Sequence, residues 1–153
     1  MKLLTVLLIS ALCLLSTGFS HSKSKPRLVG NILKKGVMDG CGCYFTFRGR
    51  TNSDHYIFAE SIEKENGVWM NIDGRDIQLT AVKDWSSSRK ERVGSRFSRS
   101  FAANNISVAS TFKVTRVCAR NDENCESSNY DATFVVKKEK RVERVRAVGV
   151  CGC

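Results

Sequence analysis

The chain has 153 residues, with 25 Lys and Arg, 15 Asp and Glu, seven Cys and a single Pro, and its formal net charge is +10. A chain of this length forms one domain and can bury roughly two thirds of the surface that it exposes when unfolded. The composition disfavours fibrous, integral-membrane and fully disordered proteins.

The first twenty residues, MKLLTVLLISALCLLSTGFS, combine a basic start, an apolar run and a small-residue end. This is the pattern of a secretory signal peptide, and its apolar run is too short to favour a membrane span. Removal of residues 1–20 takes away Lys2 and Cys13, which leaves a net charge of +9 and six cysteines. The sequence therefore predicts an exported protein, periplasmic or extracellular, with no transmembrane segment in the mature chain.

The exported part divides into a short tail and one domain. Residues 21–27, HSKSKPR, are polar and basic, and we expect them to form a flexible lead-in. Residues 28–153 contain no long linker, low-complexity tract or internal repeat, so we expect a single β domain.

Alternation of apolar and polar residues predicts strands along most of this domain. Residues 41–47 place two cysteines and two phenylalanines on one face of a strand. Asn66-Gly67 and Asp73-Gly74 flank alternating residues, and both pairs tolerate the positive φ angles of tight hairpins. Further apolar or alternating runs are residues 55–62, 68–72, 77–81, 106–118, 130–136 and 145–153. About eight strands in hairpin succession predict an all-β fold, an antiparallel meander closed as a barrel or sandwich.

The six remaining cysteines form two Cys-Gly-Cys motifs, at residues 41–43 and 151–153, and a closer pair, Cys118 and Cys125. Cysteines two apart on a strand point to the same face and rarely bond each other, so each motif is expected to bond the other. Antiparallel first and last strands would join Cys41 to Cys153. Cys43 would then bond Cys151, whereas parallel strands would give the other register. Cys118 and Cys125 are left to bond each other.

The same cysteines allow a second hypothesis, a thiolate site. The two Cys-Gly-Cys motifs could supply four soft ligands to zinc or copper. We favour structural disulfides and predict no metal, because an exported chain meets oxidants and structural zinc sites usually have two residues between paired cysteines.

Positive charge is concentrated in residues 23–35, 86–101 and 137–146, whereas residues 53–84 are net acidic. The middle basic segment interleaves bases with aromatic side chains, a pattern that suits an anionic ligand. We predict an anionic glycan, lipopolysaccharide or a protein partner, since export argues against nucleic acid. The alternative is a solvated loop that keeps the protein soluble. The predicted binding residues are Arg89, Lys90, Arg92, Arg96 and Arg99, with Phe97 as a stacking contact.

The sequence contains no recognisable catalytic motif. Its two histidines are His21, in the lead-in, and His55, at the start of a predicted strand. It has no GxSxG, no HExxH and no Gly-rich phosphate loop. General acid–base catalysis needs a carboxyl group in a pocket, whereas acidic pairs such as Asp73 and Asp76 fall in hydrophilic stretches where we expect solvated turns. We therefore predict a protein that is not an enzyme and uses no cofactor.

Two short segments resemble a known family. The Asp73-Gly74 turn, the following strand at residues 77–82 and Gly94-Ser95-Arg96-Phe97 are similar to the small exported bacterial barrels that inhibit C-type lysozyme. This resemblance implies a barrel whose loop at Val93–Ser100 enters the lysozyme cleft, with Val93 in the place of a loop serine. The paired CGC motifs are also similar to a group of uncharacterised bacterial exported proteins.

These features together predict a non-catalytic, exported binding or structural protein that holds an anionic envelope ligand through a basic loop. The alternatives are a protein inhibitor of a lysozyme-like hydrolase and a thiolate protein that binds zinc or copper.

Overall fold

The computed structural model describes residues 26–37, 40–50, 55–62, 67–83, 92–119 and 125–153. The predicted signal peptide, residues 1–20, and all of the lead-in before Pro26 lie outside the described residues. Over the described ranges the secondary structure consists of strands and turns, and no helix there has the length and hydropathy of a membrane span.

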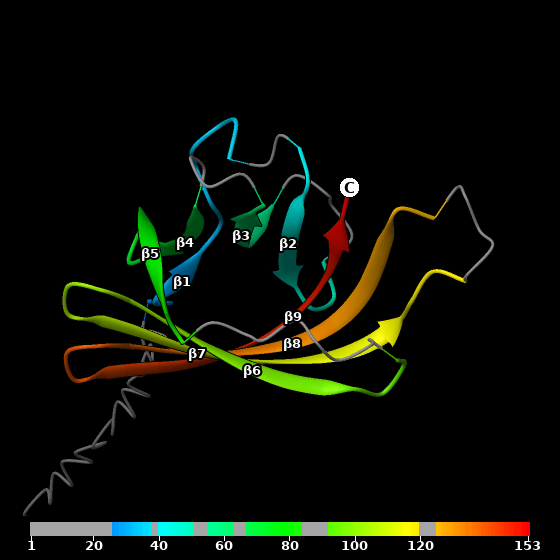
Figure 1. Cartoon of the computed structure of the whole chain (residues 1–153). Helices are drawn as coiled ribbons and strands as arrows, with labels where there is room; N and C mark the ends of the chain where they lie inside the picture. Colours follow the sequence, from blue (N-terminus) through cyan, green and yellow to red (C-terminus); the bar gives the residue numbers. More distant parts are fainter. Residues whose placement is uncertain (1–25, 38–39, 51–54, 63–66, 84–91, 120–124) are drawn as a thin grey trace, which may run out of the picture.

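The described strands form one antiparallel sheet that closes on itself (Figure 1). The strands are β1 (Val29–Gly30), β2 (Gly42–Phe47), β3 (Tyr56–Ser61), β4 (Val68–Ile72), β5 (Arg75–Lys83), β6 (Arg96–Ala103), β7 (Ile106–Arg116), β8 (Ser127–Lys138) and β9 (Arg141–Gly152). From β2 onward each strand pairs with the next, and β9 pairs back with β2. The result is a closed up-and-down barrel, with β1 added alongside β4, and the predicted all-β meander is confirmed.

Phenylalanine side chains from opposite walls fill the barrel interior. Phe45 of β2, Phe58 of β3 and Phe134 of β8 are all fully buried. The rings of Phe58 and Phe134 stack with centroids 4.9 Å apart, and Phe45 lies 5.3 Å from Phe112 of β7. These positions follow from the period-two alternation, because β7 alternates buried and exposed residues over nearly its whole length.

The seam where β2 meets β9 is cross-linked twice. The register places Cys43 directly opposite Cys151, with Cα atoms 4.0 Å apart, and the two form a disulfide. Cys41 and Cys153 form the second cross-link just beyond it. The prediction that the two motifs bond each other is therefore confirmed, and of the two registers left open the structure has the antiparallel one. The predicted Cys118–Cys125 bond is also confirmed.

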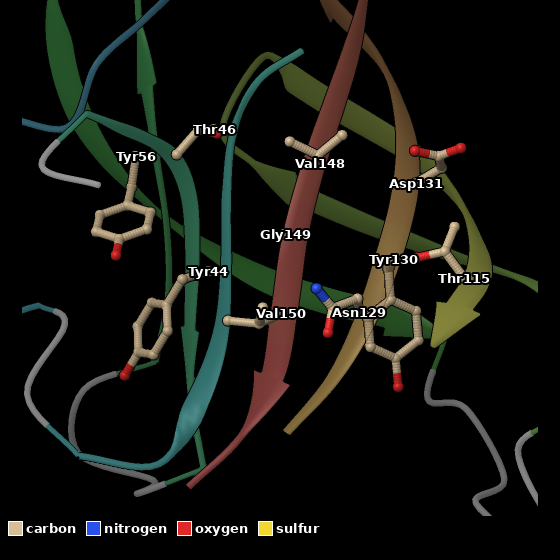
Figure 2. A pocket seen from close by; sticks show the side chains of 10 residues that line it. All are labelled: Tyr44, Thr46, Tyr56, Thr115, Asn129, Tyr130, Asp131, Val148, Gly149 and Val150. Carbon is tan, nitrogen blue, oxygen red and sulfur yellow. The ribbon is translucent and has the colours of Figure 1, made fainter. Parts of the chain in front are cut away.

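A glycine allows the seam to close tightly. Gly149 lies on β9 opposite Phe45, between β2 and β8 (Figure 2). An added Cβ there would overlap the carbonyl oxygen of Tyr44 and lie 2.5 Å from Phe45 Cδ1. A side chain at this position would push the first and last strands apart, since neither atom belongs to a flexible side-chain end.

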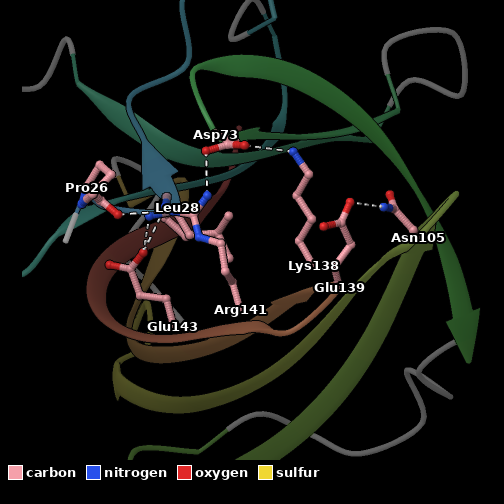
Figure 3. A network of polar contacts seen from close by, with 9 residues as sticks. Pro26, Leu28, Asp73, Asn105, Lys138, Glu139, Arg141 and Glu143 are labelled. Carbon is pink, nitrogen blue, oxygen red and sulfur yellow. Dashed lines mark hydrogen bonds and ion pairs between the residues drawn. The ribbon is translucent and has the colours of Figure 1, made fainter.

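Residues ahead of β1 are tied to the hairpin between β8 and β9 (Figure 3). The Glu143 carboxylate accepts the amide hydrogens of Leu28 and Val29 at 2.5 and 3.0 Å. Arg141 donates to the carbonyl oxygen of Pro26 and, at 2.7 Å, to the Asp73 carboxylate. Leu28 and Val29 are buried in the core, so these polar contacts fix the start of the domain against the barrel.

We expect the two seam disulfides to be redundant for stability. Once Cys41 is bonded to Cys153, 112 residues apart, Cys43 and Cys151 are already held close in the unfolded chain. Either pair alone can therefore be changed to Ala at small cost, whereas removing both should lower the free energy of unfolding by about 4–5 kcal/mol in the chain-entropy model. Denaturant titration of the three variants measures these changes.

A matched control is Cys118→Ala/Cys125→Ala, which opens a loop with a sequence separation of only 7. This change should cost about 2.5 kcal/mol. Additive losses from the two seam pairs would contradict the proposed redundancy.

Asp73 should contribute to the pH dependence of stability. Hydrogen bonds from Lys138 and Arg141 lower the pKa of Asp73 from 3.8 to about 2. Because the pKa is lower in the folded state than in the unfolded chain, ionised Asp73 stabilises the fold above pH 3.8, and this stabilisation is lost as the pH falls through about 2. Asn at this position retains the positive φ of 57° but loses the charge.

The comparison is between wild type and Asp73→Asn, unfolded in urea at several pH values. The variant should be less stable near neutral pH, and the difference should disappear at the acid end of the series. A difference that stays constant across the acid range would show that the ion pairs do not stabilise the fold.

Candidate anion-binding surface

Arginines from both sides of the seam lie together on the outside of the barrel. Arg48 follows β2, and its amide donates to the Arg146 carbonyl of β9 at 3.1 Å, which continues the ladder beyond the last paired residues. Arg144 and Arg146 face outward because the alternate residues of β9, Val145 and Ala147, are buried. The seam thus presents an arginine on each strand at the same level.

Two adjoining hollows extend this cluster, with volumes of about 420 and 180 Å³. Arg48 and Arg146 line both hollows, so the two form one continuous surface. On its far side Lys113 of β7 lies opposite Arg96 of β6 in directly paired strands. We call this surface the basic face, and its cations are Arg27, Arg48, Arg50, Arg96, Lys113, Arg144 and Arg146.

Several of these guanidinium groups are held in place by neighbours. The Arg27 and Arg50 guanidinium carbons lie 5.0 and 5.2 Å from the centre of the buried Phe47 ring. Cation–π attraction of this kind is worth about 0.5–1 kcal/mol at an exposed site. Arg48 donates to both carboxylate oxygens of Asp131 at 3.2 and 3.3 Å. The arginines are therefore oriented before any ligand arrives.

Acidic groups do not balance this charge. Among the described residues that line the two hollows, the carboxylates are those of Asp131 and Glu143. Asp131 is paired with Arg48, and Glu143 accepts two backbone amides of the β1 segment. The basic face therefore has an excess of cationic groups over carboxylates that could neutralise them.

A third hollow, of about 390 Å³, adjoins the basic face along β9 (Figure 2). The rings of Tyr44 and Tyr56 stand at one side of it, 5.6 Å apart. Asp131 lines both this hollow and the smaller hollow of the basic face. We call it the tyrosine groove, lined by Tyr44, Thr46, Tyr56, Thr115, Asn129, Tyr130, Asp131, Val148, Gly149 and Val150.

The residues predicted to bind an anion are distributed over several environments. Arg89 and Lys90 lie outside the described residues, and Arg92 is exposed ahead of β6. Arg96 lines the basic face. Contact of Arg92 and Arg96 with an anion therefore stays a prediction.

Two of the predicted residues point into the barrel. Residues 96–101 form part of strand β6, where a loop was expected, and Phe97 and Phe101 alternate toward the core. Arg99 has the same parity, and its side chain, 15% exposed, forms an ion pair with Glu60 of β3. Phe97 stacks on Phe112 with ring centroids 5.0 Å apart.

Sequence reasoning missed most cations of the basic face, although a signal for them exists. The predicted pairing of Cys43 with Cys151, continued along an antiparallel ladder, brings Arg48 opposite Arg146. Arg50 joins the cluster after a turn at Gly49, where its amide donates to the Phe47 carbonyl at 3.2 Å. The charge distribution along the chain indicates only that residues 137–146 are basic, and it does not show that they meet the residues after β2.

The residues weighed for catalysis or metal binding in the sequence have other contacts or lie exposed in the structure. Asp76 accepts the amides of Leu33 and Lys34 at 2.8 and 2.5 Å, and it also accepts Asn71 Nδ2 at 2.7 Å. His55 is exposed at the start of β3. The cysteines of the thiolate hypothesis are joined in disulfides. In the part of the chain that the structure describes, His, Cys, Asp and Glu side chains form no group of three that could hold a metal.

Comparisons of the chain with protein-family models, with curated proteins and with solved structures each found no match.

Proposed function

We propose that this is an exported, non-catalytic binding protein that holds an anionic glycan or lipopolysaccharide on its basic face. The observation that carries the proposal is that Arg48 and Arg146 lie opposite each other at the seam, with Arg50 and Arg144 lining the same hollow. Like charges that face each other across a sheet reduce stability by a few tenths of a kcal/mol or more. A surface needed only for solubility would intersperse charges of both signs.

Arginine suits this role because its planar guanidinium donates two parallel hydrogen bonds to a carboxylate, sulfate or phosphate group. The Phe47 ring contacts the guanidinium groups of Arg27 and Arg50, and Asp131 holds that of Arg48, so these three side chains lose less entropy on binding. Export is supported by the three disulfides, which are typical of small domains in oxidising compartments.

The test is Arg144→Thr/Arg146→Thr, which removes two exposed cations and keeps β-branched side chains on β9. Retention on immobilised heparin, measured across a salt series, should have its logarithmic salt dependence reduced by about two. Unchanged retention would contradict the proposal.

Two further variants locate the effect. Lys35→Thr/Arg75→Thr removes the same charge from exposed positions outside the basic face and should leave retention nearly unchanged. An equal loss in this control would show that net charge alone drives binding. Arg89→Ser/Lys90→Ser tests the bases predicted from the sequence alone.

The alternative function is inhibition of a lysozyme-like hydrolase. One observation favours it: Val93, 64% exposed, stands at a turn whose Gly94 and Ser95 amides donate to Val114 and Arg92 carbonyls at 2.8 and 2.9 Å. Such a fixed turn could present Val93 to an enzyme cleft. If so, micromolar protein should inhibit C-type lysozyme, and Val93→Asp should remove the inhibition. No inhibition by the wild-type protein would eliminate this function.

A further inference from the structure

We infer that the tyrosine groove binds a neutral sugar ring, so that the ligand of the basic face is an acidic polysaccharide in which charged and uncharged sugars alternate. This inference rests on the proposed function and names its ligand class. The groove and the basic face are continuous, because Asp131 lines both.

The groove has the composition of a site for an uncharged ring. Tyr44 and Tyr56 supply aromatic faces, and Val148 and Val150 supply apolar contact from β9 (Figure 2). The C–H face of a sugar ring packs against such side chains, as do other flat apolar surfaces. No lysine or arginine is among the described residues that line the groove.

Polar groups around the aromatic side suit sugar hydroxyls. Asn129 offers both a donor and an acceptor, and Thr46 offers a hydroxyl. The carboxylate of Asp131 accepts hydrogen bonds, and Arg48 already balances its charge. An uncharged ring offers hydroxyls to all three groups, whereas the phosphates of a nucleic acid would meet no lysine or arginine among the described residues that line the groove.

The aromatic wall is fixed in position. The Tyr44 hydroxyl donates to the Gly40 carbonyl at 2.9 Å, and the Tyr44 and Tyr56 rings meet at an interplanar angle of 53°. Both residues are half-buried and pack against the small cluster of Ile32, Val37 and Ala59, so the rings rest on the protein. A ligand therefore meets a surface that is already formed.

The spacing between the two sites suits neighbouring sugars. Gly149, at the middle of the groove, and Arg146 of the basic face are three residues apart on β9. At a rise of about 3.3 Å per residue this corresponds to roughly 10 Å. That distance is on the scale of one disaccharide repeat, so the acidic sugar next to a neutral ring in the groove lies between the groove and Arg146, within reach of the long arginine side chains.

The experiment compares three polyanions, each titrated against the full mature protein. Hyaluronan alternates a uronate with a neutral amino sugar, polyphosphate carries charge without rings, and oligo-dT carries phosphates with flat bases. Tyr56→Leu keeps apolar volume but removes the aromatic face, and Asn129→Ala removes the amide. Each should weaken hyaluronan binding about tenfold while leaving polyphosphate binding unchanged.

Arg144→Thr/Arg146→Thr is the matched comparison and should weaken binding of both hyaluronan and polyphosphate. Melting temperatures establish that each variant is folded. If Tyr56→Leu does not fold, Asn129→Ala decides the question, because Asn129 lies on the outer face and outside the core clusters.

Each other outcome has a defined meaning. Binding of polyphosphate without hyaluronan overturns the sugar site and leaves the proposed function standing, whereas binding of neither overturns both. Equal weakening of hyaluronan and polyphosphate by Tyr56→Leu, or no weakening, also overturns the sugar site. Oligo-dT binding that depends on Tyr56 would assign the groove to nucleic acid. Self-association of the free protein that Tyr56→Leu abolishes would assign it to a second copy.

Discussion

The pairing of β2 with β9 is the constraint on which the rest of the structure depends. It joins strands that are about a hundred residues apart in the chain, and without it the meander would be an open sheet with two unpaired edges. Two disulfides hold this seam, and Gly149 lets the Phe45 ring approach it closely. The covalent bonds act mainly on the unfolded chain, whose freedom they restrict. Core packing and backbone hydrogen bonds then select the native strand register from a much smaller set of unfolded conformations.

The same seam creates the proposed binding surface. In an antiparallel pair of strands each outward residue lies opposite one defined residue of the other strand. The register set by the cysteines therefore also determines which arginines face each other. Arg48 and Arg146 are neighbours for the same geometric reason that Cys43 and Cys151 are. Like charges in such positions cost stability, and a protein whose seam is covalently closed can tolerate that cost. In our proposal an anionic ligand neutralises them.

Much of this fold could be predicted because its signals are local. Period-two alternation identified the face of β2 that carries Cys43 and Phe45, and the Asp73-Gly74 turn identified a hairpin. The error at residues 96–101 has a physical cause. Closely spaced bases favoured the interpretation of a basic binding loop, but alternation sends Phe97 and Arg99 inward in a strand, where Glu60 supplies the opposite charge. The candidate site was predicted only at Arg96, because its other cations come from separate segments.

The sequence by itself determined the parity of the strands, the Asp73-Gly74 hairpin turn and the bonding of one Cys-Gly-Cys motif to the other, since each depends on residues close in the chain or on a choice between few bonds. Only the tertiary structure decided which cations share a face and that Asp131 lies between them and the tyrosines. The reason is that shifts in strand register add up from strand to strand around a closed barrel. Irregular pairing near Phe45 and Val114 shifts later residues relative to their partners. Such shifts depend on the packing of the whole barrel, and no local pattern encodes them.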